Sequence, residues 1–311
     1  MAFYYTREIN KRSVNEESFC NMEIRMNHEA AVSAMVVADG MGGLSAGKRY
    51  SEYAINMWYG ELVKTVMGDG FRDGSLEQQI DALMEFSGQI FEKINRALYQ
   101  KGMDAGVKGG TTLSCAIHFW DTWIISNCGD SPVYLMKNGS LSLVSEIQNV
   151  ASQLVKKGMT KEGSTIFYQN KNRLTEYLGK REEVHPYCIR LNEEKLESLL
   201  LGSDGAFGDL SFNQIEMILN EQRDPQDILK ELFEQARLGG EEDNQTAVLY
   251  LGDKKMSEDT FRMNLYGDMK LEEAFQNSVV PFCSYTELES DRKNTPIREK
   301  LLHRWMGGKE E

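Results

Sequence analysis

The sequence lacks the cysteine and histidine patterns of a disulfide-rich or zinc-binding protein. Its five cysteines are odd in number, lie far apart and include no C-x-x-C pair (Cys20, Cys115, Cys128, Cys188 and Cys283). None has an arginine six positions later, which excludes the C-x5-R loop of enzymes with a thiolate nucleophile. The four histidines show no spacing typical of zinc ligands (His28, His118, His185 and His303). We therefore predict reduced thiols, as in the cytoplasm.

Long apolar runs are also missing. The longest near-continuous one covers residues 30–38 and is far too short to span a bilayer. The N-terminal stretch MAFYYTREINKR has no apolar signal core. The net charge is −13 and the pI is near 5.0, and so acidic a protein is not a general binder of nucleic acid or anionic membranes. We predict a cytoplasmic protein that binds neither.

Strand and helix patterns are dense between residues 1 and 252. Period-two or continuous apolar runs predict strands at residues 2–9, 17–24, 32–39, 112–119, 122–128, 133–137, 141–144, 196–203 and 245–251. Helical spacing and capping residues predict helices at 46–66, from Ser75 to about 99, at 150–157, after Ser211 and after Asp224. Asn138-Gly139 is typical of a hairpin turn. Antiparallel strands with inserted helix pairs indicate an α+β layered fold.

The stretch VVADGMGGLSAGKRY, residues 36–50, admits two interpretations. Residues 42–48 match the phosphate-binding spacing G-x-x-x-x-G-K, but Arg49 stands where that loop needs a serine or threonine to bind magnesium. Ser45 likewise replaces the last glycine of a dinucleotide fingerprint. The remaining interpretation is that Asp39 lies at the end of a buried strand and presents its carboxylate to a metal.

Acidic residues recur at the ends of predicted strands. They are Glu16, Asp39, Asp130, Asp204 and Asp243. Any one of them is typical of an ordinary turn. If the five converge, however, they form an oxygen-only cluster, which stays ionised only in the presence of hard cations such as Mg²⁺ or Mn²⁺.

Six motifs in order make the sequence similar to a known family. They are Arg12-x-x-Asn15-Glu16-Glu17, Asp39-Gly40-Met41-Gly42-Gly43, Gly110-Thr111-Thr112-Leu113, Asn127-Cys128-Gly129-Asp130-Ser131, Ser203-Asp204-Gly205 and Asp243-Asn244-x-Thr246. The set resembles the metal-dependent protein phosphatases, the PPM or type 2C Ser/Thr phosphatases, in their bacterial branch. The resemblance covers residues 1–252 and implies a four-layer α-β-β-α sandwich of two antiparallel sheets flanked by helix pairs.

The resemblance also implies a role for each matched residue. Asp39 would bridge two Mn²⁺ or Mg²⁺ ions, with the Gly40 carbonyl on one of them and Asp204 and Asp243 on the other. Glu16 would order metal-bound water, and Asp130 matches the position associated with a third, weaker ion. Arg12 would bind the substrate phosphate, and Glu17 and Asn244 would support the ligands through hydrogen bonds.

The implied reaction is hydrolysis of phosphoserine and phosphothreonine by a metal-activated water, without a phosphoenzyme. The substrates would be phosphoproteins made by a Ser/Thr kinase. Two residues depart from the family pattern. Met41 stands where some members carry a histidine proposed as general acid, and Glu17 stands where an aspartate is usual. The alternative is a pseudophosphatase that serves as a binding or signalling module.

The last 59 residues, 253–311, have a different character. They are polar, and their one strong pattern is a short amphipathic segment at residues 297–305. We treat them as a C-terminal extension outside the phosphatase domain of residues 1–252. A small packed appendage is the favoured interpretation, and a docking segment is the other.

Overall fold

The computed structural model describes residues 2–26, 30–42, 46–192, 196–221, 223–252 and 262–263. The chain divides into two compact units, Met1–Leu265 and Tyr266–Glu311, and the described residues all belong to the first. Gly43 of the Asp-Gly-Met-Gly-Gly motif, His28 and His303 lie outside these ranges. The amphipathic segment predicted at residues 297–305 also lies outside the described residues.

The first sheet contains both termini of the predicted phosphatase region. Its strands lie in the order β1 (Ala2–Glu8), β11 (Gln245–Leu251), β10 (Ser198–Gly202), β7 (Val133–Lys137) and β8 (Ser140–Leu143). Every pairing in it is antiparallel. The predicted hairpin between β7 and β8 is confirmed, because Asn138 and Gly139 adopt φ angles of 52° and 71°, as a type I′ turn requires.

The second sheet carries the Asp39 strand at its centre. Its order is β12 (Arg262–Met263), β2 (Glu17–Arg25), β3 (Ala31–Met41), β5 (Leu113–Phe119), β6 (Thr122–Cys128) and β9 (Tyr187–Asn192), and β4 (Gly110–Thr111) pairs with the end of β3. The pairings are antiparallel as predicted, except that β12 adds to β2 in parallel.

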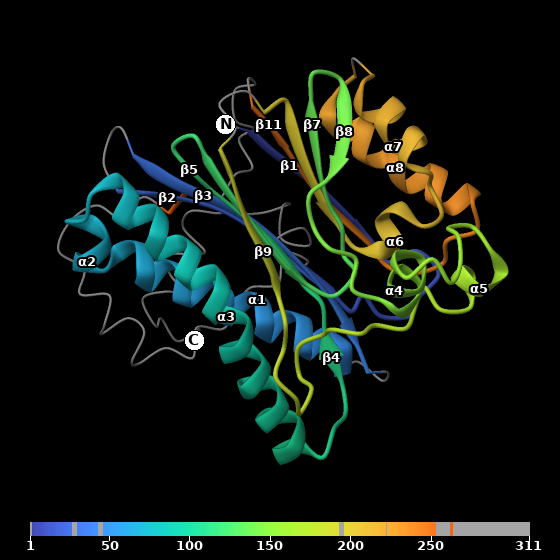
Figure 1. The fold of residues 1–311 in the computed structure, drawn as a ribbon, viewed down its shortest axis with the longest axis horizontal. Coiled ribbons are helices and arrows are strands. Elements are labelled where there is room, and N and C mark those ends of the chain that lie inside the picture. Colours follow the sequence, from blue (N-terminus) through green and yellow to red (C-terminus); the bar gives the residue numbers. More distant parts are fainter. Residues whose placement is uncertain are drawn as a thin grey trace, which may run out of the picture. The chain divides into compact units, whose positions relative to one another are not determined.

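Helices cover the outer side of each sheet (Figure 1). On the second sheet lie α1 (Ala46–Met67), α2 (Asp69–Arg72) and α3 (Leu76–Ala105). On the first sheet lie α6 (Asp204–Phe207), α7 (Phe212–Leu219) and α8 (Pro225–Leu238), and α4 (Val150–Lys156) and α5 (Thr165–Tyr168) follow β8. The predicted α+β sandwich is therefore confirmed, with the added short helices α2, α5 and α6.

Local sequence explains where the long helices begin and end. Ser75 caps α3 through a capping box with Gln78, and the left-handed Gly106, at φ 64°, ends it. The helix therefore runs beyond the predicted end near residue 99. The predicted capping box of Ser211 and Gln214 is present at α7, and Pro225 opens α8 after the Asp224 cap.

The core has two layers because β10 and β11 are buried on both faces. Leu200 and Leu249 pack with the apolar side of α7 and α8. Side chains alternate along a strand, so Leu199, Leu201 and Val248, also fully buried, face the second sheet. Among the described residues, no helix is both long and apolar enough to cross a membrane.

We predict that truncation near Asp253 leaves a folded enzyme that is active on small substrates. The described pairing of β12 with β2 makes a second end point informative, because the first compact unit extends to Leu265. Chains ending at residues 252 and 265 should be compared for thermal unfolding and for turnover of an aryl phosphate. An insoluble or inactive product of both cuts would show that the tail belongs to the domain core. Loss of activity on a protein substrate alone would support docking.

Candidate active site

Asp39 lies near the end of β3, where the chain is held by the threonines of the Gly-Thr-Thr motif. Its backbone N–H donates to Oγ1 of Thr112 over 3.0 Å, and its carbonyl accepts from the Thr112 N–H over 2.8 Å. The Thr111 hydroxyl donates to the same carbonyl over 2.9 Å. The antiparallel ladders with β2 and β5 fix the strand on either side. The Asp39 backbone therefore has little freedom to move.

The carboxylate of Asp39 faces other acidic groups in a buried environment. Burial raises its pKa well above the usual value, and the charges of Asp204, Glu17, Asp130 and Asp243 raise it further. The structure thus brings together five acidic residues that are separated by up to 226 positions in the chain, from 17 to 243. Four of these residues belong to the five that the sequence hypothesis named, and Glu17 stands in this set where the hypothesis had Glu16.

Asp204 and Asp243 approach each other because α6 begins against the loop before β11. A Cβ on Gly205 would lie 2.2 Å from the Asn244 carbonyl oxygen, so only glycine permits this contact. Burial raises the pKa of Asp204, as does the charge of Asp243, whereas a hydrogen bond with Asp39 lowers it. Asp39 and Asp204 are therefore in direct contact.

Glu16 and Gly40 lie together where β2 begins. The Gly40 N–H donates to the Glu16 carbonyl over 3.2 Å. A Cβ on Gly47 would be 2.7 Å from both the Gly40 carbonyl oxygen and Glu16 Oε1, so the N-terminal turn of α1 closes over these oxygens. Glu16 Oε1 is buried and has no hydrogen-bond partner, which is unusual for a carboxylate oxygen.

Glu17 is the register partner of Asp39 and is 1% exposed. Burial raises its pKa to about 8, the side chains of Thr246 and Ser203 partly offset that rise, and Asp204 and Asp243 add to it. Its Oε2 atom is buried without a hydrogen-bond partner. Glutamate is longer than the aspartate that is usual at this position in the family, and the Glu17 side chain therefore reaches the acidic cluster itself.

Asp130 lies in the turn after β6 and is buried. Burial and then the charge of Asp204 raise its pKa well above the usual value, while a hydrogen bond from the Asn149 side chain opposes the rise. The adjoining Ser131 hydroxyl is 2.8 Å from Thr112 Oγ1. Thr112 thus connects the Asp39 and Asp130 turns directly.

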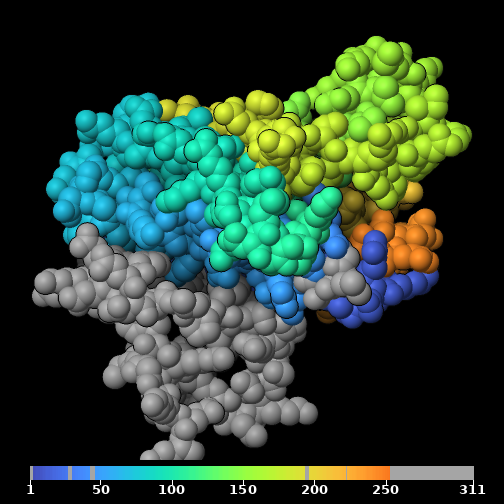
Figure 2. All heavy atoms as spheres, turned by 90° about the horizontal axis from the view of Figure 1, so that it is seen from below, coloured from blue at the N-terminus to red at the C-terminus, as the bar shows by residue number. Residues whose placement is uncertain are grey.

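Arg12 lies at the rim of the cluster, beside the segment that carries Asp243. Its Nη2 donates to Asp243 Oδ2 over 2.6 Å, and its side chain is 55% exposed. Figure 2 shows the N-terminal segment (dark blue) against the segment before β11 (orange). Buried Asn244 joins the two segments, because its Oδ1 accepts from the Glu16 N–H over 2.8 Å and its Nδ2 donates to the Ile9 carbonyl over 2.9 Å.

These residues fit a hard divalent cation. Within the described part of the chain, no three His, Cys, Asp or Glu side chains already enclose a metal-sized space. Burial and then mutual repulsion nevertheless raise the pKa values of Asp39 and Asp204, and two buried carboxylate oxygens have no partner. A donor set made only of oxygens favours Mg²⁺ or Mn²⁺ over softer metals. A cation would relieve the repulsion and satisfy the two oxygens.

Sequence reasoning did not single out three residues that shape this site. Thr112 belongs to the Gly-Thr-Thr motif and Gln148 belongs to none, although both contact the Asp130 turn. Lys171 is the third. Burial lowers its pKa, but Asp209, Glu241 and Asp204 together raise it, which places a cation near the cluster. The position of Gln148 just before a helix cap was the one available signal.

Comparison with known proteins agrees with this architecture. A family model described as protein phosphatase 2C matches residues 12–249. A putative protein phosphatase 2C-type of Streptococcus pyogenes is 27% identical over 243 residues, which cover 78% of this chain and 94% of that protein. Protein phosphatase PhpP of Streptococcus pneumoniae is 25% identical over the same coverage.

Solved structures agree as well. The serine/threonine phosphatase of Streptococcus agalactiae superposes with a TM-score of 0.68 at 26% identity, covering 80% of this chain and 99% of that one. The Mycobacterium tuberculosis serine/threonine phosphatase PstP/Ppp has the same fold, with a TM-score of 0.61 at 22% identity. The family match spans every acidic residue of the cluster, from Glu16 to Asp243, and the chain belongs to the protein phosphatase 2C family.

Proposed function

We propose that the protein hydrolyses phosphoserine and phosphothreonine on other proteins, using two Mn²⁺ or Mg²⁺ ions held by the acidic cluster. The observation that carries the proposal is the convergence of Asp204, Glu17, Asp130 and Asp243 on Asp39. The names of the relatives support it, since they are serine/threonine phosphatases. The opposing enzyme is then a Ser/Thr kinase, and docking through residues 253–311 is the alternative to a packed appendage that the truncation tests. The free thiols of the four described cysteines support a cytoplasmic location.

Each ligand has a stated place in this proposal. Asp39 and the Gly40 carbonyl would hold one ion, Asp39 with Asp204 and Asp243 would hold the other, and Glu16 would order metal-bound water. Asp130 would hold a third, weaker ion. When bound, such ions lower the pKa of a water molecule and neutralise phosphoryl oxygens. Asn244 and Glu17 keep the ligands in place, Asn244 through its bond to the Glu16 backbone and Glu17 beside Asp39.

Arg12 binds the substrate phosphate. A guanidinium suits a phosphate because two parallel N–H groups can reach two oxygens. Its side chain is more than half exposed, and its one described partner is Asp243. An arriving dianion therefore finds this cation at the rim of the cluster without displacing a buried contact. A cation here also offsets the negative charge that would otherwise repel the substrate.

Arg12→Ala should lower kcat/KM for a phosphoserine peptide by roughly 10–100-fold, the usual effect of losing a charged hydrogen bond. Most of the loss should appear in KM, because the metal ligands are unchanged. Lys11→Ala is the matched control, since Lys11 is exposed and pairs with Glu242 instead. Similar losses in both variants would mean that general surface charge, and not a phosphate contact, is responsible.

The test of the proposed function uses the full chain with Mn²⁺ and peptides that carry phosphoserine, phosphothreonine or phosphotyrosine. We expect release of inorganic phosphate from the first two, with no labelled protein after acid quench of a reaction with radioactive phosphopeptide. Peptide binding without any phosphate release would favour the alternative, a pseudophosphatase that acts as a binding module. A labelled protein would contradict direct attack by water.

A further inference from the structure

Gln148 forms two hydrogen bonds with Gly129, the residue that precedes Asp130. Its backbone N–H donates to the Gly129 carbonyl over 3.0 Å, and its side-chain Oε1 accepts from the Gly129 N–H over 2.9 Å. Gly129 has a φ of +116°, and a Cβ at this position would lie 2.6 Å from Thr112 Cγ2. The turn therefore adopts a conformation reserved for glycine, and Gln148 holds it through two hydrogen bonds.

The other half of the Gln148 amide points away from Asp130. Its Nε2 donates to the His185 carbonyl over 2.9 Å, and the side chain is 7% exposed. The Gln148 carbonyl accepts from the Thr175 N–H over 2.9 Å. Thr175 and His185 lie near the two ends of one segment, residues 174–185, which we call the strap. Both ends of the strap are therefore hydrogen-bonded to Gln148.

The strap is also fastened to the Asp39 side of the site. Leu178 forms a two-way bridge with Thr111, with N–O distances of 2.9 and 3.0 Å. The Thr111 hydroxyl in turn donates to the Asp39 carbonyl. A single segment is therefore linked to the Asp39 backbone through Thr111 and to the Gly129–Asp130 turn through Gln148, although it contributes no acidic ligand of its own.

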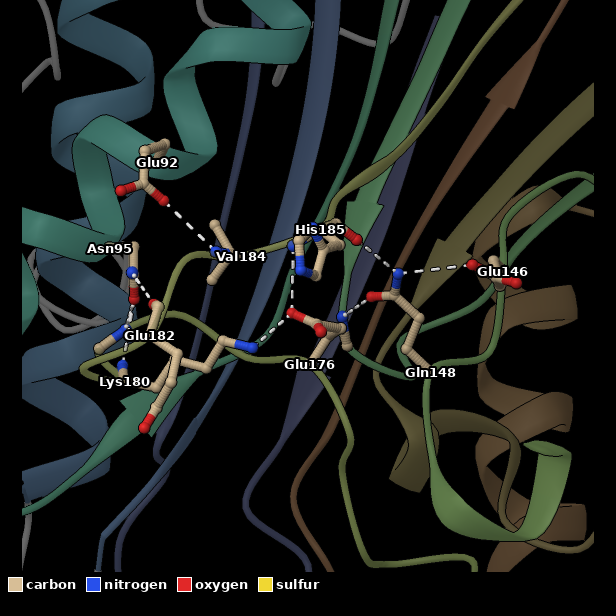
Figure 3. Close-up of polar contacts among 11 residues, drawn as sticks. Glu92, Asn95, Glu146, Gln148, Glu176, Lys180, Glu182, Val184 and His185 are labelled. Carbon is tan, nitrogen blue, oxygen red and sulfur yellow. Dashed lines mark hydrogen bonds and ion pairs between the residues drawn. The ribbon is translucent and has the colours of Figure 1, made fainter. Parts of the chain in front are cut away.

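Helix α3 supplies the fixed support for the strap (Figure 3). Asn95 on α3 is 2% exposed, and its Oδ1 accepts from the N–H groups of Gly179 and Lys180 over 2.8 and 3.1 Å. Its Nδ2 donates to the Glu182 carbonyl over 3.0 Å. Within the strap, Glu176 Oε2 accepts from Lys180 Nζ over 2.7 Å and from the His185 N–H over 3.1 Å.

The ion pair inside the strap is sheltered from solvent. The side chains of Lys180 and Glu176 are 11% and 15% exposed, and the charges of both act on Cys128, immediately before Gly129. A pair this well shielded holds its geometry better than an exposed one. The His185 carbonyl that orients the Gln148 amide is therefore itself held in place.

We propose that Gln148 is a positioning residue for the phosphatase reaction, which fixes the Gly129–Asp130 turn against the strap and so sets where the Asp130 carboxylate lies. The inference rests on the proposed function, because it assigns Gln148 an effect on a catalytic carboxylate. Gln148 need not touch the substrate or a metal ion. Supporting partners of this kind are worth roughly 10–100-fold in metal affinity or activity.

The test compares Gln148→Met with Asp130→Ala. Methionine keeps the length of the side chain but removes the three hydrogen bonds of its amide, to Gly129, His185 and Glu146. We expect Gln148→Met to lower turnover of a phosphoserine peptide about 10–100-fold more than turnover of p-nitrophenyl phosphate. The double variant should lose little beyond Asp130→Ala alone, since the two residues act through one group. Gln153→Met is the matched control, because Gln153 is exposed on α4 and makes none of these contacts.

A second readout does not need activity. Titration with Mn²⁺ followed by calorimetry should show that Gln148→Met and Asp130→Ala weaken the same low-affinity binding phase and leave the tight phase intact. Gln148→Glu keeps the acceptor for the Gly129 N–H. Its ratio of phosphoserine-peptide turnover to p-nitrophenyl phosphate turnover should lie between those of wild type and Gln148→Met. If Gln148→Met proves unstable, the Gln148→Glu protein carries the same comparison.

Equal losses on both substrates, or full additivity with Asp130→Ala, would overturn the positioning role. So would an unchanged low-affinity Mn²⁺ phase in a folded Gln148→Met protein. These results are distinct from failure of the proposed function, which would appear as a wild-type chain that releases no phosphate from any phosphopeptide.

Discussion

Asp39→Asn is expected to reduce phosphate release from a phosphoserine peptide by roughly 10³-fold or more, which amounts to loss of measurable turnover. Asparagine has nearly the same volume but cannot bridge two cations with a negative charge. The other acidic groups of the cluster would then lack the shared ligand that holds both ions. The measurement is a steady-state rate with saturating Mn²⁺ on purified protein.

The same variant should keep its fold, for an electrostatic reason. Burial and four neighbouring acidic groups raise the pKa of Asp39, so removing its charge relieves repulsion in the metal-free protein. We expect the metal-free unfolding temperature to stay equal or rise, and the stabilisation by Mn²⁺ seen in wild type to be lost. Asp209→Asn is the control, since Asp209 is exposed and pairs with Lys171. Near-wild-type turnover by Asp39→Asn would make the two-ion assignment wrong.

Asp130→Ala is expected to separate two classes of substrate. A serine alkoxide is a poor leaving group, and general-acid assistance is typically worth about 10²–10⁴-fold. Met41 has no proton to give, and no histidine lies in the motifs of the site. Protonation of the leaving group should therefore depend on the Asp130 turn. Turnover of a phosphoserine peptide should fall far more than that of p-nitrophenyl phosphate, whose leaving group is a stabilised anion.

The comparison requires both substrates on one protein preparation at saturating Mn²⁺. Asp121→Ala is a suitable control, because Asp121 is an exposed residue in the turn at the other end of β6. A matching loss on both substrates would mean that Asp130 serves general metal binding or the structure of the turn. The proton-donor role would then have to be abandoned.

Most strands and long helices could be predicted from the sequence because their patterns are local. The apolar run before Asp39, the Asn138-Gly139 turn and the Ser211 capping box each give one structure on local grounds. Strand β9 was missed, although Tyr187, Ile189 and Leu191 alternate with more polar residues. Its side chains are only half-buried, so the contrast between its two faces is weak. Helix α3 was predicted too short because its last turns are largely exposed.

The site residues that stand in sequence motifs could be predicted. Those whose role depends on tertiary contacts could not. Asp39, Asp204 and Asp243 stand at strand ends, and a glycine directly follows Asp39 and Asp204, which is a visible pattern. The pairing of Arg12 with Asp243 joins residues 231 positions apart, and no local pattern shows it. The same holds for Gln148, whose amide acquires a role only because the chain folds to bring Gly129 and His185 against it.

The most direct measurement is phosphate release from one phosphothreonine peptide by one preparation of the full chain, first with Mn²⁺, then with excess EDTA, then after Mn²⁺ is restored. We expect turnover in the first stage, loss of it in the second and recovery in the third, because the acidic cluster acts only when cations neutralise it. Undiminished release in EDTA, or no release at any stage from a folded protein, would contradict metal-dependent hydrolysis at Asp39.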